Sequence, residues 1–186
     1  MPKFVAKGRD GAGFRGNIRV FCRVRPFHHE EDYQSRTLFT LDENNVFLKV
    51  AETKIKQYKF DKVFNQCSTQ GDVFAEVEPV IKSALDGYNV CIFAYGQTGS
   101  GKTYTMEGKP TDLGVIPRAI QALFDRTSGS NRRFLFTFSM LEIYMGNLRD
   151  LLVPGSKTQG FKKVPSALVF QGYLAVLHNQ ENEQGH

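Results

Sequence analysis

One stretch of the sequence decides the fold, and it reads Val90-Cys91-Ile92-Phe93-Ala94-Tyr95-Gly96-Gln97-Thr98-Gly99-Ser100-Gly101-Lys102-Thr103. Its first half is an apolar run that ends at a glycine, which is the pattern of a buried β-strand. Its second half fits Gly-x-x-x-x-Gly-Lys-Thr, the loop that joins a strand to a helix and surrounds phosphate groups. This order of strand, loop and helix predicts a nucleotide site.

The spacing of the loop follows from the chemistry of a polyphosphate. Gly96, Gly99 and Gly101 carry no Cβ, so their backbone N–H groups can turn toward an anion. The helix that starts near Lys102 directs its positive end at the same phosphates. Lys102 is expected to place its charge on the β- and γ-phosphates, and the Thr103 hydroxyl is expected to bind Mg²⁺. A glycine-rich turn that matches by chance is the alternative, but four fixed positions after a strand favour the site.

Composition sets wider limits. A chain of 186 residues with 41% hydrophobic and 23% charged residues is typical of one globular domain. The net charge of +5 is a mild bias toward anionic partners, although the basic residues are scattered. The three cysteines show no C-x-x-C spacing, which favours free thiols in a reducing compartment. No apolar run approaches the length that spans a membrane, so a cytoplasmic protein is expected.

The chain before the loop predicts strands and one helix. Residues 1–15 are interpreted as a flexible leader, residues 17–24 as a strand, and residues 37–64 as a β-meander. Thr69-x-x-Asp72 resembles a capping box that opens an amphipathic helix, which ends at Gly87 and in which Pro79 marks a kink or a restart. A strand over residues 89–95 follows.

The chain after the loop predicts a second helix and a further strand. Gly108, Pro110 and Asp112 interrupt the helix, which resumes near Ile116 and runs to residue 125. Residues 133–144 are apolar enough to form a long strand that is buried on both faces. The whole order predicts an α/β fold, a layered sheet with flanking helices and the nucleotide at the carboxyl end of a central strand.

Two points remain open when the residues are considered alone. The sequence lacks the Asn/Thr-Lys-x-Asp pattern that reads guanine, so adenine is preferred by elimination. Arg23, Arg25 and Pro26 end a strand, and two solvated arginines are favoured there over a rigid corner that packs on a planar group.

A family resemblance is carried by several segments in one order. Residues 16–26 (GNIRVFCRVRP) resemble the first motor strand of kinesins, with a Gly-Asn junction similar to that of the kinesin-14, carboxy-terminal-motor class. Residues 58–64 (YKFDKVF), residues 87–106 around the phosphate loop, residues 114–119 (GVIPRA), and the segments LEIY and RDLL resemble later kinesin motifs. The resemblance covers residues 16–153, the N-terminal half of a kinesin motor domain with a P-loop NTPase fold.

The resemblance implies ATP with Mg²⁺ as cofactors, microtubules (tubulin) as the partner, and ATP hydrolysis coupled to movement along the cytoskeleton. It implies neither nucleic acid nor a membrane as a partner, and it suggests a dimer within a longer parent protein. It also assigns Arg23, Arg25, Pro26 and Tyr104 to the adenine. The implied nucleotide-binding residues of the loop are Gly96, Gln97, Thr98, Gly99, Ser100, Gly101, Lys102 and Thr103, with Thr103 also holding the metal.

The sequence departs from the family pattern after Val153. Neither the Asn…Ser-Ser-Arg-Ser-His pattern of switch I nor the Asp-Leu-Ala-Gly pattern of switch II occurs, so no catalytic residue is identified and a truncated motor is expected. Residues 154–186 match no pattern and are interpreted as an unmatched tail. Two hypotheses follow. The first is a kinesin-like, microtubule-stimulated P-loop ATPase. The second is a chain that does not hydrolyse ATP and either only binds nucleotide or interferes with full-length motors.

Overall fold

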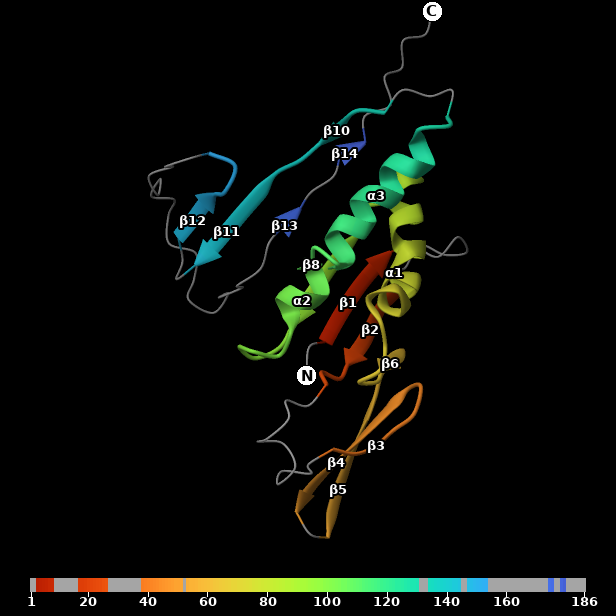
Figure 1. The fold of residues 1–186 in the computed structure, drawn as a ribbon, viewed down its shortest axis with the longest axis vertical. Helices are drawn as coiled ribbons and strands as arrows, with labels where there is room; N and C mark the ends of the chain where they lie inside the picture. Colours follow the sequence, from red (N-terminus) through yellow and green to blue (C-terminus); the bar gives the residue numbers. More distant parts are fainter. Residues whose placement is uncertain are drawn as a thin grey trace, which may run out of the picture. The chain divides into compact units, whose positions relative to one another are not determined.

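The computed structural model describes residues 3–8, 17–26, 38–51, 53–130, 134–144, 147–153, 174–175 and 178–179 (Figure 1). The chain divides into two compact units, Met1–Arg126 and Thr127–His186. The first unit contains the phosphate loop and is therefore the part that positions the candidate site.

A four-stranded sheet forms the centre of the first unit. Its strands are β1 (Lys3–Gly8), β2 (Asn17–Arg23), β6 (Lys62–Phe64) and β7 (Cys91–Tyr95), in the order β6-β2-β1-β7. β1 is antiparallel to both β2 and β7, and β2 is parallel to β6. The strands predicted before Pro26 and before the phosphate loop are thus confirmed, and they run parallel to each other on either side of β1.

The first strand differs from the expectation of a flexible leader. Lys3–Gly8 pairs along its whole length with β2 and, from Lys3 to Lys7, also with β7. Both edges of this segment therefore have backbone hydrogen-bond partners, which stabilise an extended conformation that its short apolar run does not specify by itself.

The two faces of the sheet have different surroundings. On β2, Arg19 and Arg23 make hydrogen bonds to α1 (Gln70–Leu85), whereas Cys22 and Val24 pack on the opposite face in a cluster with Val46 and Val63. Phe21 and Cys22 are fully buried, so both faces of the sheet are covered at this end of β2. The core of the unit therefore lies where β2, β6, α1 and the meander meet.

Part of the second sheet face is open. Val20 and Phe93 both pair with Val5 in the register of the sheet, so Ile18, Phe93 and Tyr95 share the face opposite α1. Their exposed fractions are 61%, 47% and 67%. The strand at Cys91–Tyr95 was expected to be buried, and within this unit that expectation is wrong for Phe93 and Tyr95.

Helix α1 begins and ends as its sequence predicts. The Thr69 hydroxyl accepts a hydrogen bond from the Asp72 N–H, and the Asp72 carboxylate accepts one from the Thr69 N–H at 2.7 Å, which completes a capping box. Gly87, with φ +87°, follows the last turn, as a C-terminal glycine does. The helix is continuous through Pro79, so a restart at that proline does not occur.

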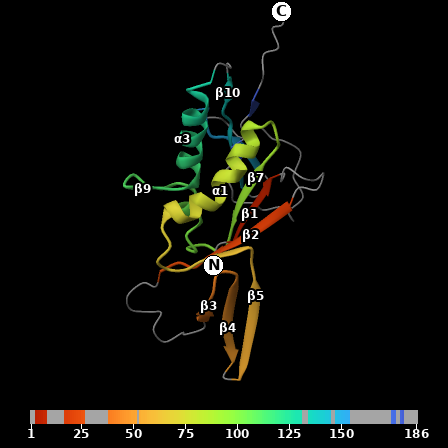
Figure 2. The same cartoon turned by 90° about the vertical axis from the view of Figure 1, so that its right-hand side faces the viewer.

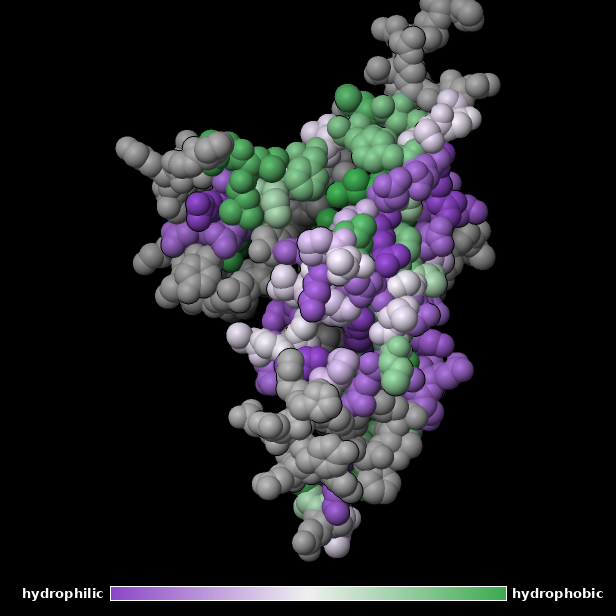
Figure 3. All heavy atoms as spheres, viewed as in Figure 1, coloured by the Kyte–Doolittle hydropathy of each residue, from purple (hydrophilic) through white to green (hydrophobic). Residues whose placement is uncertain are grey.

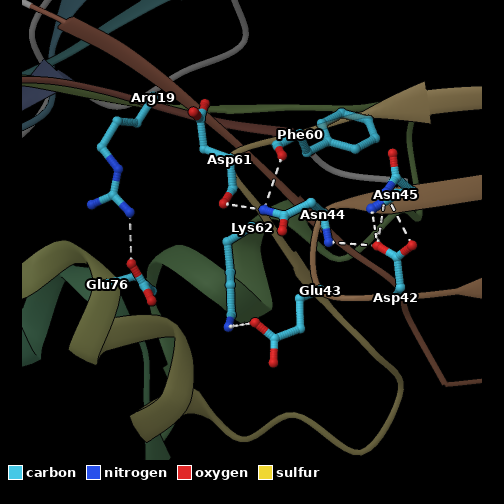
Figure 4. A network of polar contacts seen from close by, with 9 residues as sticks. All are labelled: Arg19, Asp42, Glu43, Asn44, Asn45, Phe60, Asp61, Lys62 and Glu76. Carbon is cyan, nitrogen blue, oxygen red and sulfur yellow. Dashed lines mark hydrogen bonds and ion pairs between the residues drawn. The ribbon is translucent and has the colours of Figure 1, made fainter.

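A three-stranded meander lies beside the sheet, as expected. Its strands are β3 (Leu38–Leu41), β4 (Asn45–Ala51) and β5 (Lys54–Lys59), all antiparallel. Figure 4 shows how polar contacts fix its base: the Asn44 side-chain amide donates to the carbonyl oxygens of Phe60 and Asp61, and Lys62 pairs with Glu43 at 3.4 Å. The Arg19–Glu76 ion pair in the same view joins β2 to α1 at 2.7 Å.

The chain after the phosphate loop forms two helices with a hairpin between them. They are α2 (Lys102–Met106), β8 (Gly108–Lys109), β9 (Asp112–Leu113) and α3 (Val115–Thr127). The interruption predicted at Gly108 is confirmed as a tight hairpin, which projects from the unit in Figure 2. The same view places α1 and α3 on one side of the sheet, and Arg126 on α3 forms an ion pair with Glu78 on α1.

The surface of the first unit is mostly hydrophilic along α1 and around α2 (Figure 3). On α3, Phe124 is 53% exposed. Within the described part of the chain, no helix is both long enough and apolar enough to cross a membrane.

The second unit consists of short strands. β11 (Met140–Tyr144) pairs with β12 (Asn147–Asp150) and β13 (Leu174–Ala175), and β10 (Phe136–Thr137) pairs with β14 (His178–Asn179). The single long buried strand expected over residues 133–144 is therefore wrong, since Leu135 and Phe138 are 56% and 43% exposed. Burial on both faces requires covering layers, which an apolar sequence cannot supply by itself.

Candidate functional site

The phosphate loop connects the end of β7 to the start of α2. Gly99 and Gly101 have φ angles of +76° and +94°, in the region that side chains with a Cβ rarely adopt. A Cβ at either position would meet nothing within 4 Å, so the requirement for glycine comes from the backbone torsion and not from crowding. Gly96 is not among the glycines with a positive φ angle. The backbone torsion therefore requires glycine at two of the three loop positions.

Lys102 folds back over the loop that precedes it. Its Nζ donates hydrogen bonds to the carbonyl oxygens of Gly96 at 2.7 Å and Gln97 at 3.0 Å. The ammonium group is therefore held at the mouth of the loop, although α2 itself is only five residues long. Most of the positive charge that the loop offers to an anion comes from this side chain, because a helix of one turn has a small dipole.

Ser100 is buried in the loop with an unsatisfied hydroxyl. Its side chain is 7% exposed, and its Oγ has no hydrogen-bond partner within the part of the chain that the structure describes. Buried hydroxyl groups almost always have a partner, so this one indicates a missing acceptor or donor. Gln97, Thr98 and Thr103 are exposed around it. A phosphate group fits this arrangement, because its oxygens can accept hydrogen bonds from the Ser100 hydroxyl and from the Lys102 ammonium group.

Arg25 connects the end of β2 to the same loop. Its guanidinium donates a hydrogen bond to the carbonyl oxygen of Gly99 at 2.8 Å, and both Arg25 and Pro26 are exposed. The Arg/Pro corner therefore lies next to the phosphate loop, and its assignment to the adenine stays a prediction. It does not stand free in solvent, which was the interpretation favoured from the residues alone.

Arg23 takes a different position from Arg25. Its side chain is buried, 7% exposed, and donates to the Gln70 side-chain oxygen at 2.7 Å and to the Thr105 hydroxyl at 3.0 Å. Burial lowers the pKa of the Arg23 guanidinium, while Tyr104 and Asp112 act in the opposite direction. Arginine titrates so far above neutral pH that the group stays charged. Arg23 thus connects the end of β2, the start of α1 and helix α2.

Tyr104 is held from three directions. Its carbonyl oxygen accepts a hydrogen bond from the Gln70 side-chain amide at 2.6 Å, and its hydroxyl donates to the Asp112 carboxylate at 2.7 Å. The Arg23 guanidinium carbon lies 5.2 Å from the ring centre and the Lys109 ammonium 5.9 Å from it, within the range of cation–π attraction. The hydrogen bond to Asp112, with burial and the carboxylate charge, raises the pKa of Tyr104. The ring is 37% exposed and remains open to a ligand.

A separate hollow of about 550 Å³ lies between the base of the meander and α1. Its lining includes four acidic residues and one lysine: Asp42, Glu43, Asp72, Glu76 and Lys62. None of its lining residues belongs to the phosphate loop. No group of three or more potential metal ligands from His, Cys, Asp or Glu occurs in the described parts of the chain. None of the three cysteines, all of which lie in the described part of the chain, forms a disulfide; Cys22 is buried and Cys67 is exposed.

The structure brings the predicted residues together. Arg25 contacts the loop at Gly99, Tyr104 lies in the helix that follows the loop, and Arg23 lies against the Tyr104 ring. Sequence reasoning missed Gln70, Thr105 and Asp112, which hold Arg23 and Tyr104 in place. Gln70 is 47 residues away from Arg23 in the sequence, so no local pattern could indicate this contact. The roles of all these residues toward a nucleotide stay predictions.

Comparison with known proteins gives a consistent result. The family model described as the kinesin motor domain matches residues 23–177, which extends past residue 153, where the resemblance noted from the sequence ended. The division into a motor part and an unmatched tail stays a prediction.

Individual relatives are similar to the same part of the chain. The chain is 84% identical over 152 residues to the kinesin-like protein KIN-14B of Oryza sativa subsp. japonica, covering 82% of this chain and 18% of that protein. It is 56% identical over 154 residues to KIN-14T of Arabidopsis thaliana, covering 83% and 18%, and 49% identical over 148 residues to protein claret segregational of Drosophila melanogaster, covering 74% and 21%. The predicted resemblance to kinesin-14 motor domains is confirmed, and the chain spans about a fifth of the length of these relatives.

Proposed function

Because the chain belongs to the kinesin motor domain family, whose fold is the α/β fold of P-loop NTPases, we propose that it binds ATP with Mg²⁺ at residues 96–103. The observation that carries the proposal is the phosphate loop, with its two left-handed glycines, its held Lys102 and the unsatisfied hydroxyl of Ser100. These features suit a triphosphate and are not required by the packing of the chain itself.

The glycine-rich turn, Lys102 and Thr103 each have a proposed role. The N–H groups of the glycine-rich turn hold phosphate oxygens, and Lys102 exchanges its carbonyl partners for the β- and γ-phosphates. The exposed Thr103 hydroxyl would bind Mg²⁺, which is usually held by one or two protein groups together with phosphates and water. Bound Mg²⁺ supplies neutralisation of the triphosphate charge.

The adenine contacts are proposed at the neighbouring corner. Tyr104 offers an exposed part of its ring, while Arg25 and Pro26 lie exposed beside the loop. Arg23 is buried, so its proposed contribution to the base passes through the Tyr104 ring that it underlies. Base stacking on an aromatic ring is typically worth about 1–3 kcal/mol.

The larger protein is proposed to be a kinesin-like microtubule motor ATPase. We place this chain at the N-terminal half of the motor's layered sheet, with microtubules as partner, dimerisation in a longer parent protein, and a cytoplasmic, cytoskeletal location. The support is the family match and the kinesin-14 relatives. Neither nucleic acid nor a membrane is among the proposed partners.

A second candidate function concerns this polypeptide by itself. The sequence contains neither the Ser-Ser-Arg-Ser-His nor the Asp-Leu-Ala-Gly pattern that positions water and senses the γ-phosphate in the family. This favours a chain that binds nucleotide without hydrolysing it, while hydrolysis belongs to the whole motor.

Two measurements on the purified chain test these proposals. Binding of Mg·ATP is measured by calorimetry for the wild type and for Lys102→Ala, and the variant is expected to lose most of the affinity. ATP turnover is then measured with and without microtubules, with Lys102→Ala as control. Wild-type turnover above that of the control would overturn the non-hydrolysing candidate. Wild-type protein that is folded but binds no Mg·ATP would overturn the proposed site.

A further inference from the structure

The contacts around Tyr104 form a closed arrangement of three elements. The ring belongs to α2, the carboxylate that accepts its hydroxyl proton belongs to β9, and the amide that donates to its carbonyl oxygen belongs to α1. The main chain of Tyr104 is thus fixed from one side and the tip of its ring from the other. None of these contacts involves the phosphate loop directly.

Asp112 is itself held in place by its surroundings. Its carboxylate lies 3.6 Å from the guanidinium of Arg118, and the same arginine donates a hydrogen bond to the Leu113 carbonyl oxygen at 2.7 Å. The backbone of the hairpin that carries Asp112 is closely packed. A Cβ added to Gly108 would lie only 2.3 Å from the Gly114 nitrogen. Asp112 therefore reaches Tyr104 from a backbone with little freedom to shift.

The Tyr104 ring has few other restraints at its exposed edge. It is 37% exposed, and the Lys109 side chain near it is also exposed. Without the bond from its hydroxyl, rotation about the side chain would let the ring leave the position beside Arg23. An aromatic surface binds a planar group best when its orientation is fixed before the ligand arrives.

We propose that Asp112 is a positioning residue that fixes the Tyr104 ring for a nucleotide base, so that the preference for ATP over a base-free polyphosphate depends on the β8–β9 hairpin. This inference rests on the proposed nucleotide site and deepens it, because it separates recognition of the base from recognition of the phosphates. The phosphates are bound by residues 96–103, and the base is presented with a ring whose orientation is set by Asp112.

The experiment compares two ligands, Mg·ATP and Mg·triphosphate, with the purified full chain. Asp112→Ala is expected to weaken ATP binding about three- to tenfold, the range of one hydrogen bond, and to leave triphosphate binding within about twofold. Asp112→Asn is expected to retain ATP affinity, since its amide oxygen still accepts a bond from the Tyr104 hydroxyl. Tyr104→Phe, which keeps the ring but not the hydroxyl, is expected to match Asp112→Ala.

Matched controls separate this inference from the proposed site. Asp125→Ala removes the same charge from α3, where the carboxylate accepts a bond from Gln121, and should change neither affinity. Lys102→Ala should weaken both ligands, and failure of the wild type to bind either ligand would overturn the proposed site. The positioning role alone would be overturned if Asp112→Ala left the ratio of the affinities for Mg·ATP and Mg·triphosphate unchanged, for example by weakening both ligands equally. It would also be overturned if Asp112→Asn behaved like Asp112→Ala. Thermal unfolding of each variant confirms that it is folded.

Discussion

The guanidinium of Arg25 donates a hydrogen bond of 2.8 Å to the carbonyl oxygen of Gly99, a residue 74 positions further along the chain. The end of β2 is thereby attached to the middle of the phosphate loop. This contact fixes the carbonyl group of Gly99, one of the two loop glycines whose φ angles are positive.

Removal of this contact is expected to weaken nucleotide binding. Arg25→Ala should lower the affinity for Mg·ATP by about 1 kcal/mol, less than is usual for a charged hydrogen bond, because the side chain is exposed. Calorimetric titration measures the change. Arg126→Ala, which removes an arginine paired with Glu78 on α1, is the control. Equal affinities of Arg25→Ala and the wild type would show that the contact has no part in binding.

Arg23 and Gln70 are expected to stabilise the fold as a coupled pair. Arg23→Ala leaves the Gln70 oxygen and the Thr105 hydroxyl buried without this donor, so we expect a loss of about 2–4 kcal/mol in the free energy of unfolding. Urea denaturation of Arg23→Ala, Gln70→Ala and the double variant gives their coupling energy. A value above about 0.5 kcal/mol is expected, and strict additivity would contradict a direct interaction.

The capping box of α1 predicts a dependence of stability on pH. Hydrogen bonds from the Thr69 N–H and hydroxyl lower the pKa of Asp72 below its ordinary value. The ionised carboxylate therefore stabilises the folded chain above about pH 4, and this contribution is lost as the pH falls through the lowered pKa. Asp72→Asn should be less stable than the wild type in urea at neutral pH, and the difference should shrink in acid.

A matched variant makes the capping test specific. Asp125→Asn removes a carboxylate from α3, outside any capping box, and should not reproduce the loss at neutral pH. If the Asp72→Asn difference were the same at neutral pH and in acid, the carboxylate would not act through its charge. Thr69→Ala should itself cost about 1 kcal/mol, the usual value for an N-cap residue.

Two glycines with similar φ angles are expected to respond differently to substitution. At Gly87, with φ +87°, an added Cβ meets nothing within 4 Å, so Gly87→Ala should cost only about 1–2 kcal/mol for the torsion. At Gly108, with φ +81°, a Cβ would meet the Gly114 nitrogen at 2.3 Å. Gly108→Ala should therefore destabilise the chain more in thermal unfolding, and comparable losses would contradict the crowding in the hairpin.

Local patterns in the sequence predicted the parts of the fold that depend on local chemistry. Thr69 and Asp72 are three residues apart, and their capping box forms through contacts within one turn. The phosphate loop is similar, because glycine torsions and a lysine at a fixed spacing are properties of one short segment. The turn at Asp42, whose carboxylate accepts the N–H groups of Asn44 and Asn45, depends on local contacts in the same way.

The features that sequence reasoning missed depend on distant partners. Strand β1 is ordered by its pairing with β2 and β7, and the second of these strands lies more than 80 residues away. Gln70 lies within the capping-box segment of α1, but its role depends on Arg23 and on the Tyr104 carbonyl group, which are distant in the sequence. The exposure of Phe93 depends on which layers cover the sheet, which an apolar strand does not specify.

The two carbonyl contacts of Lys102 also have an entropic consequence. A free lysine side chain samples many rotamers, and ordering it costs up to about 2 kcal/mol when a ligand binds. In this loop the Gly96 and Gln97 carbonyl oxygens already restrict those rotamers. An arriving triphosphate therefore replaces existing partners of an ordered cation, and most of the ordering cost is met during folding.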